Sequence, residues 1–183
     1  HNPFCDNGIK LFAGNGYKIS APEESLIEEC ILKRLDKKQI GFSGKLGKHV
    51  EKNVLSEAYA EDIRQQFRKT HFNTRILVDC SNGAFSKVAR IALREYSDNA
   101  LFINDQPNGH NINLNCGALE SNTLLQYIQE NDFDYGIAFD GDGDRAIFIN
   151  KDYGVIESDK IMFLFFSFLS SGMPNSCIVS TEI

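Results

Sequence analysis

The residues with the strongest chemical signal lie in one short stretch. Aspartates alternate with glycines from Asp140 through Asp142 to Asp144, and Arg145 follows directly. At separations of about 5 Å and an effective dielectric of about 20, each pair of carboxylates repels by on the order of 3 kcal/mol, which a divalent cation would relieve. Ligands that are all oxygen favour a hard ion such as Mg²⁺, which proteins often hold together with phosphate oxygens of the substrate. The stretch therefore predicts a metal site that handles phosphate.

Arg145 supports this interpretation, because its planar guanidinium offers a fork of donors that matches phosphate. One alternative is a solvated acidic hairpin turn, since Asp-Gly is a common turn sequence. Another is a calcium loop of the EF-hand type, but Arg145 stands where that loop needs glycine and Lys151 where it needs glutamate. The flanking residues are also patterned as strands rather than helices. A metal site between two strands is the favoured interpretation.

The elements around this stretch predict an α/β fold. Short apolar runs indicate strands, and periodic apolar positions indicate helices between them. The expected strands are residues 76–78, 100–103, 135–139 and 146–150, and the expected helices are about 56–68, 88–95 and 122–130. This alternation predicts a layered sheet with flanking helices. The metal-binding stretch would then join the last two of these strands.

The two ends of the chain carry weaker signals. Residues 1–18 are rich in turns, and a capping box at Ser20–Glu23 predicts a helix that ends near Leu35. The apolar run 161–169 is nine residues long, well short of the roughly 20 that a membrane span needs, and is expected to be a buried helix. A β-branched run at 178–183 resembles a strand. Both ends look cut, as if from a longer chain.

Composition excludes several classes of protein. The 183 residues are 42% hydrophobic and 24% charged, which is typical of a folded domain, and their net charge of −6 gives no broad attraction to nucleic acid or an anionic membrane. Five cysteines lie far apart with no CxxC pair, which argues against a disulfide framework or a zinc site. We expect a reducing cytoplasm, with Cys80 and Cys177 as small core residues in strands.

Two motifs in order carry a family resemblance. Residues 139–145 resemble the metal loop of the α-D-phosphohexomutases, and residues 1–3 with 6–10 resemble their active-site serine loop. Three further stretches are most similar to the phosphoglucosamine mutase branch of that family: residues 79–84, residues 108–113 with Cys116 and Gly117, and residues 158–162. The resemblance covers essentially the whole chain.

The resemblance implies a four-domain enzyme of which this chain holds the middle. Residues 1–55 would be the C-terminal part of domain one, 56–157 the complete domain two with the metal loop, and 158–183 the start of domain three. Mg²⁺ would be held by Asp140, Asp142, Asp144 and a phosphoserine, which in the family lies immediately before the position of His1.

The same resemblance assigns roles to other residues. Arg145 would orient the phosphate, and Lys10, with His1 as a second candidate, would act as general acid or base at the sugar hydroxyl. The reaction would interconvert glucosamine 6-phosphate and glucosamine 1-phosphate through a bisphosphate intermediate, for cell-wall precursors. We expect the 183 residues alone to be inactive, because covalent transfer needs the serine nucleophile.

Three alternatives stay open at this point. The sugar could be glucose or mannose, since the loop expected to select it would lie beyond Ile183. The chain could be a module that binds Mg²⁺ or Ca²⁺ without catalysis. It could also be a remnant with a structural or regulatory role.

Overall fold

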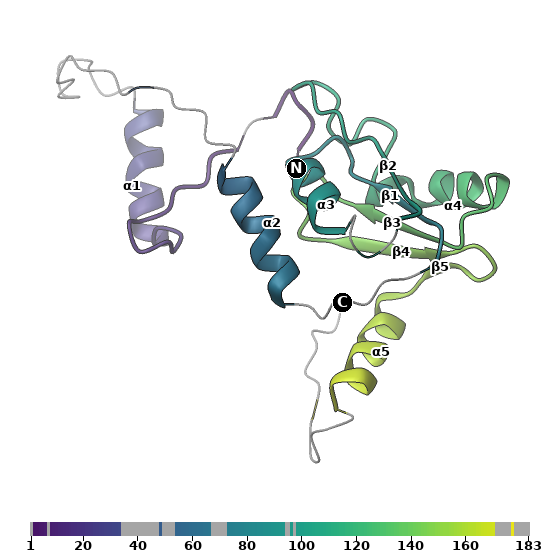
Figure 1. The fold of residues 1–183 in the computed structure, drawn as a ribbon. Helices are drawn as coiled ribbons and strands as arrows, with labels where there is room; N and C mark the ends of the chain where they lie inside the picture. The colour runs from purple at the N-terminus through teal and green to yellow at the C-terminus, as the bar shows by residue number, and fades with distance from the viewer. Residues whose placement is uncertain are drawn as a thin grey trace. The chain divides into compact units, whose positions relative to one another are not determined.

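The computed structural model describes residues 2–6, 8–33, 48, 54–66, 73–93, 96, 98–170 and 177. The chain divides into two compact units (Figure 1). The small unit is Asn7–Lys52, and the large unit combines His1–Asp6 with Asn53–Ile183. The metal-binding stretch lies in the large unit.

The small unit contains helix α1 (Ala21–Leu32), which begins at the predicted capping box. The carboxylate of Glu23 accepts hydrogen bonds from the hydroxyl of Ser20 at 2.7 Å and from its N–H at 2.9 Å. These two bonds, the hydroxyl first, lower the pKa of Glu23 below its ordinary value. The predicted helix end near Leu35 lies outside the described residues.

The large unit is built on a five-stranded sheet in the order β2-β1-β3-β4-β5. Strand β1 pairs in parallel with β2 and β3, whereas β3, β4 and β5 form two consecutive antiparallel hairpins. The strand bounds are β1 Ile76–Asp79, β2 Ala100–Ile103, β3 Tyr135–Phe139, β4 Ala146–Asn150 and β5 Gly154–Ile156. The four predicted strands are confirmed, and β5 was not predicted because three residues are too few to show an alternating pattern.

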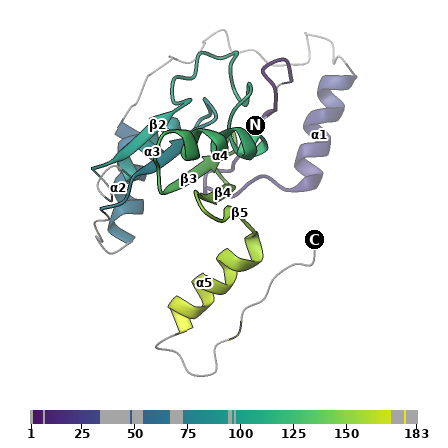
Figure 2. The same cartoon turned by 90° about the vertical axis from the view of Figure 1, so that its right-hand side faces the viewer.

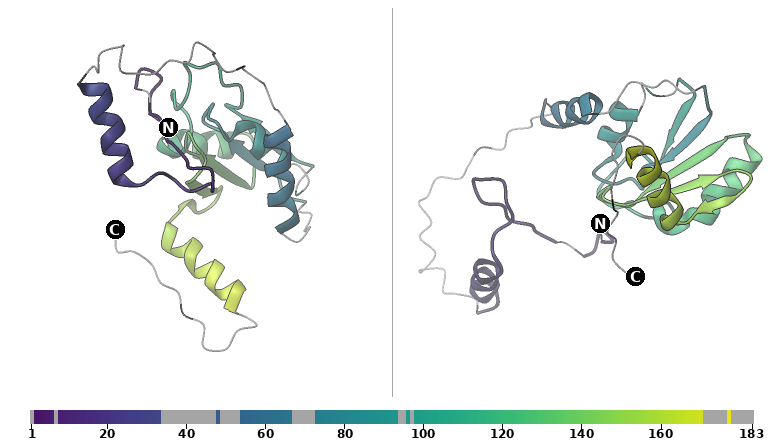
Figure 3. Two further views of the ribbon diagram at one scale, coloured as in Figure 1. Left: turned by 90° about the vertical axis from the view of Figure 1, so that its left-hand side faces the viewer. Right: turned by 90° about the horizontal axis from the view of Figure 1, so that it is seen from below.

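Helices cover both faces of this sheet (Figures 2 and 3). Successive side chains of a strand point to opposite faces, so Leu77 packs in one apolar cluster with Ile128 of α4, and Val78 packs in a second with Ala89 of α3. The helix bounds are α2 Val54–Gln66, α3 Ser86–Leu93 and α4 Ser121–Glu130, with a short 3₁₀ turn η1 at Ala118–Glu120. The predicted α/β fold of a layered sheet with flanking helices is confirmed.

The C-terminal part corrects two expectations. The predicted apolar helix exists as α5 (Ser158–Ser170), but none of its residues is buried, and Phe168 is 77% exposed. The reason is that α5 extends away from the sheet instead of lying across one of its faces (Figures 1 and 2). Cys80 lies in the core as predicted, whereas Cys177 is exposed. The predicted strand at 178–183 lies outside the described residues.

Among the residues that the structure describes, none of the helices has the length and hydropathy of a membrane span. This holds for α5 as well, although it is rich in phenylalanine.

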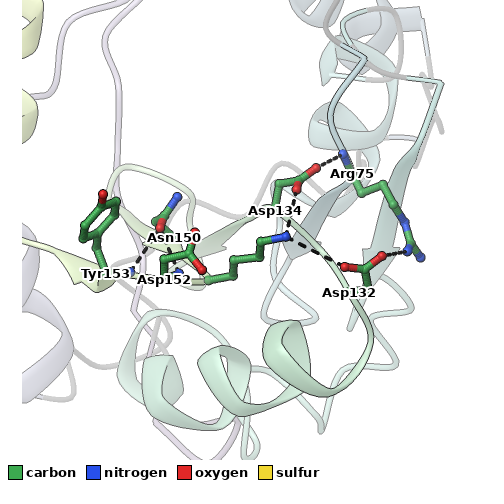
Figure 4. Close-up of polar contacts among 7 residues, drawn as sticks. Arg75, Asp132, Asp134, Asn150, Asp152 and Tyr153 are labelled. Atoms are coloured by element: carbon green, nitrogen blue, oxygen red, sulfur yellow. Dashed lines mark hydrogen bonds and ion pairs between the residues drawn. The ribbon is translucent and has the colours of Figure 1, made fainter.

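A network of charges ties three strands together at one end of the sheet (Figure 4). The carboxylate of Asp134, just before β3, accepts a hydrogen bond at 2.9 Å from the backbone N–H of Arg75, just before β1, and lies 3.4 Å from the ammonium of Lys151, just after β4. Asp132 lies between the same two cations. The backbone hydrogen bond from Arg75 is the main reason that the pKa of Asp134 is lowered, and Lys151 adds to the effect.

This network predicts a stability that depends on pH. Because the pKa of Asp134 is lower in the folded than in the unfolded state, its carboxylate stabilises the fold above the unfolded pKa, and this contribution is lost as pH falls through the folded pKa. We expect Asp134→Asn to reduce the free energy of unfolding at pH 7 by about 1 kcal/mol or less, the size typical of partly exposed ion pairs. Thermal unfolding would show the difference in stability between the parent and Asp134→Asn becoming smaller in acid. The control is Asp152→Asn, which removes an exposed carboxylate from the turn after β4. The prediction would be contradicted if Asp134→Asn differed from the parent by the same amount at pH 7 and in acid.

Candidate metal centre

The turn between β3 and β4 gathers three carboxylates. We call residues Asp140–Arg145 the metal loop; it starts where the last pair of the hairpin, Phe139 and Ala146, ends. One ligand oxygen from each of Asp140, Asp142 and Asp144 lies within 4.8 Å of the others. Gly143 has φ +74°, a backbone conformation that costs little only for glycine. A donor set made of carboxylate oxygens fits a hard divalent cation, Mg²⁺ or Ca²⁺.

Asp140 anchors the metal loop. Its side chain is buried, and one oxygen accepts the N–H groups of Gly143 and Arg145, both at 3.1 Å. The other oxygen accepts a hydrogen bond at 2.8 Å from Nε of Arg145. Burial alone would raise the pKa of Asp140, but the backbone and side-chain hydrogen bonds from Arg145 outweigh it and lower the pKa below its ordinary value. Asp140 therefore stays ionised.

Asp144 has the opposite environment for its charge. Partial desolvation, its hydrogen bond with Asp140 and the negative charges of Asp142 and Asp140 raise its pKa above the ordinary value. Arg145 lowers it in part, with Nε 3.6 Å from the carboxylate. A proton therefore competes with a cation at Asp144, and binding of a cation should strengthen as pH rises.

The structure brings together four of the six residues predicted for the site: the three aspartates and Arg145. Lys10 lies in the small unit, two residues before the bridge between Phe12 and Lys18. His1 lies outside the described residues. The roles of all six residues stay predictions.

Asp79, the last residue of β1, was not among the predicted site residues. Asp79 is 3% exposed, and its two carboxylate oxygens accept the N–H groups of Ser81 at 2.9 Å and Gly117 at 2.8 Å. It thereby joins the turn after β1 to the loop before η1. The available signal was a charged residue directly after the apolar run of β1, because a buried carboxylate must find donors.

Comparison with known proteins adds to this geometry. A family model described as phosphoglucomutase/phosphomannomutase, alpha/beta/alpha domain II, matches residues 57–154. The chain is 38% identical over 164 residues to the phosphoglucosamine mutase of Rhizobium etli, covering 88% of this chain and 36% of that protein. It is also 38% identical over 169 residues to the phosphoglucosamine mutase of Koribacter versatilis, covering 90% of this chain and 36% of that protein. The chain thus spans little more than a third of the length of these relatives.

A solved structure supports the fold. A phosphoglucomutase/phosphomannomutase family protein from Burkholderia thailandensis superposes with a TM-score of 0.61 at 22% identity, over 84% of this chain and 32% of that chain. At this identity the likeness supports the architecture of the sheet and helices and carries no statement about substrate.

The carboxylate cluster predicts binding of a cation that a single substitution weakens. We expect Asp142→Asn to lower the affinity for Mg²⁺ by about tenfold or more, equivalent to about 1.4 kcal/mol, because the cluster loses one of three anionic ligands. Isothermal titration calorimetry would measure the change. Asp152→Asn removes a carboxylate outside the metal loop and should leave the affinity unaltered. Equal affinities in both variants would show that the three aspartates do not form the site.

Proposed function

Because the chain belongs to the phosphoglucomutase/phosphomannomutase family, we propose that it carries the metal-binding part of a phosphoglucosamine mutase. Such an enzyme interconverts glucosamine 6-phosphate and glucosamine 1-phosphate. The observation that carries the proposal is the cluster of three carboxylates at the β3–β4 turn, beside an arginine suited to phosphate. Similarity to phosphoglucosamine mutases over most of the chain supports the choice of sugar.

The three aspartates would hold Mg²⁺ in this proposal. When bound, the ion would neutralise negative charge on the phosphoryl group during its transfer. Asp140 suits this role because it is already ionised and held by hydrogen bonds, so it needs little rearrangement to serve as a ligand. Asp144 is exposed, so its side chain has room to adjust as a ligand of the ion.

Arg145 would orient the phosphate. Its Nε bonds to Asp140, while the side chain as a whole is 62% exposed, so part of the guanidinium can face a ligand. The bond to Asp140 also raises the pKa of Arg145. The residue therefore carries its positive charge at every pH at which the enzyme would work, and it can contact two phosphate oxygens at once.

Lys10 and His1 would complete the chemistry. We place a phosphorylated serine, the donor of the phosphoryl group, directly before His1. A sugar hydroxyl attacks the phosphorus of this phosphoserine, the serine oxygen leaves, and Lys10 or His1 accepts the proton of the hydroxyl. The resulting sugar bisphosphate turns over in the site. The serine oxygen then attacks the phosphorus of its other phosphate, and the sugar oxygen that leaves takes up the proton held by Lys10 or His1.

The proposal also covers the domains and the compartment. Residues 1–55, 56–157 and 158–183 would belong to the first, second and third domains of the full-length enzyme. A cytoplasmic role in supplying amino sugar for the cell wall is part of the same proposal.

Turnover by the full-length gene product tests the proposal. With Mg²⁺ and glucosamine 6-phosphate, we expect ³¹P NMR to show glucosamine 1-phosphate, with a higher kcat/KM than for glucose 6-phosphate or mannose 6-phosphate. Asp142→Asn should lower kcat by about 100-fold, equivalent to about 2.7 kcal/mol, whereas Asp152→Asn should remain close to the parent. The 183 residues alone should bind Mg²⁺ without turnover.

Each other outcome has a distinct meaning. Preference for glucose or mannose phosphate would retain the mutase and change its substrate. Binding of Mg²⁺ by the full-length gene product without turnover of any of the three sugar phosphates would refute the enzyme and leave a metal-binding module. Absence of a phosphorylated serine before the position of His1 would refute the proposed phosphoryl donor.

A further inference from the structure

In the metal loop, the residues that carry the carboxylates alternate with residues that contact another part of the large unit. Its carboxylates occupy alternate positions, 140, 142 and 144. The residues between and before them, Phe139, Gly141 and Gly143, each contact the turn that joins β1 to α3. We call residues Ser81–Phe85 of this turn the template segment. Its contacts follow the loop in order from Phe139 to Gly143.

The first contact fixes the start of the loop. The hydroxyl of Ser81 donates a hydrogen bond to the carbonyl oxygen of Phe139, the residue before Asp140. Ser81 is completely buried and has φ +55°, an unusual conformation for a residue other than glycine. Gly117 packs against this bond so closely that a Cβ there would overlap both Ser81 and Phe139. The hydroxyl of Ser81 is therefore closely packed between Gly117 and the carbonyl group of Phe139.

The next two contacts follow the loop around its bend. The N–H of Ala84 donates to the carbonyl oxygen of Gly141 at 2.9 Å, and a Cβ on Gly83 would overlap the same carbonyl group. At Gly143 a Cβ would lie 2.5 Å from the Cβ of Phe85, whose ring also packs edge-on against Phe139 at 5.0 Å between centroids. Both glycines of the loop therefore abut the template segment directly.

The template segment is held by contacts that do not involve the metal loop. Asp79 accepts the N–H of Ser81, the N–H of Asn82 donates to the carbonyl oxygen of Asn104 at 2.5 Å, and the hydroxyl of Ser86 donates to the carbonyl oxygen of Gly83 at 2.7 Å. These bonds reach the turn itself, the residue after β2 and the start of α3. The conformation of the template segment is therefore fixed by contacts outside the metal loop, so the segment can position the loop.

We propose that the template segment sets the spacing of the three carboxylates, and that Ser81 and Gly83 are positioning residues for the cation site. The carboxylates repel one another, so without the contacts of the template segment we expect the loop to move them apart. Residues that orient ligands typically change metal affinity by about 10- to 100-fold when they are replaced. The effect on cation binding stands by itself, whereas the effect on turnover rests on the proposed function.

The test compares two template variants with a matched glycine. Ser81→Ala removes the hydroxyl, and Gly83→Ala forces the template away from Gly141. The control is Gly136→Ala in β3, where the added Cβ would lie 2.3 Å from Cδ1 of Ile128, the flexible end of a side chain, and does not meet the metal loop. Each is made in the full-length gene product, with Mn²⁺ as the probe and electron paramagnetic resonance to measure unbound Mn²⁺. Circular dichroism and thermal unfolding report the fold.

We expect Ser81→Ala and Gly83→Ala to lower the affinity for Mn²⁺ by about 10- to 100-fold while the fold is retained. Gly136→Ala should lower the midpoint of thermal unfolding and leave the affinity unchanged. If the parent turns over glucosamine 6-phosphate, kcat should fall more than KM changes in the two template variants.

Two results would overturn the proposal: affinity equal to that of the parent in folded Ser81→Ala, or an equal loss of affinity in Gly136→Ala. If Gly83→Ala fails to fold, Ser81→Ala decides alone. A parent with no mutase activity refutes the proposed function, and the Mn²⁺ comparison still decides the role of the template segment.

Discussion

The repulsion among Asp140, Asp142 and Asp144 is the constraint around which this part of the fold is arranged. The three ligand oxygens lie within 4.8 Å of one another, so the charges repel, although solvent screens the exposed Asp142 and Asp144. The fold offsets this repulsion in two ways: Arg145 and the N–H groups of the loop stabilise the charge of Asp140, and the template segment holds the backbone from behind. The unequal pKa values of Asp140 and Asp144 follow from the same crowding.

The topology of the sheet places the metal loop at one end of the parallel strands and the charge network of Asp134 at the other end. Parallel strands β1 and β3 end at the same edge, so Asp79 at the end of β1 and Asp140 after β3 come together there. The network of Arg75, Asp134 and Lys151 lies at the other ends of these strands (Figure 4). Ligands of α/β sheets generally bind at the carboxyl ends of the parallel strands, and the metal loop conforms to that rule. The antiparallel β4 is also required, because only a hairpin returns the chain within six residues.

The apolar residues show which parts of the fold local sequence can predict. Strands β2, β3 and β4 have the predicted bounds because buried apolar runs flanked by turns are a local signal. The exposure of α5 could not be predicted in this way. The hydrophobicity of a helix favours burial, but it does not specify which other element would cover the helix. The divisions at 55 and 157, and the roles of the six predicted site residues, remain predictions.

The sequence by itself determined the chemistry: the alternation of aspartate and glycine, the arginine beside it and the strands on either side predicted a cluster of carboxylates suited to a divalent cation. Only the tertiary structure decided what holds that cluster in shape. Ser81 and Phe139 are 58 positions apart, and Asp79 and Gly117 are 38 apart, so their contacts leave no periodic trace in the chain. A serine in a turn and a glycine before a helix carry no sign of such a role locally. Ser81 meets Phe139 because parallel pairing of β1 and β3 brings the turn after β1 next to the end of β3.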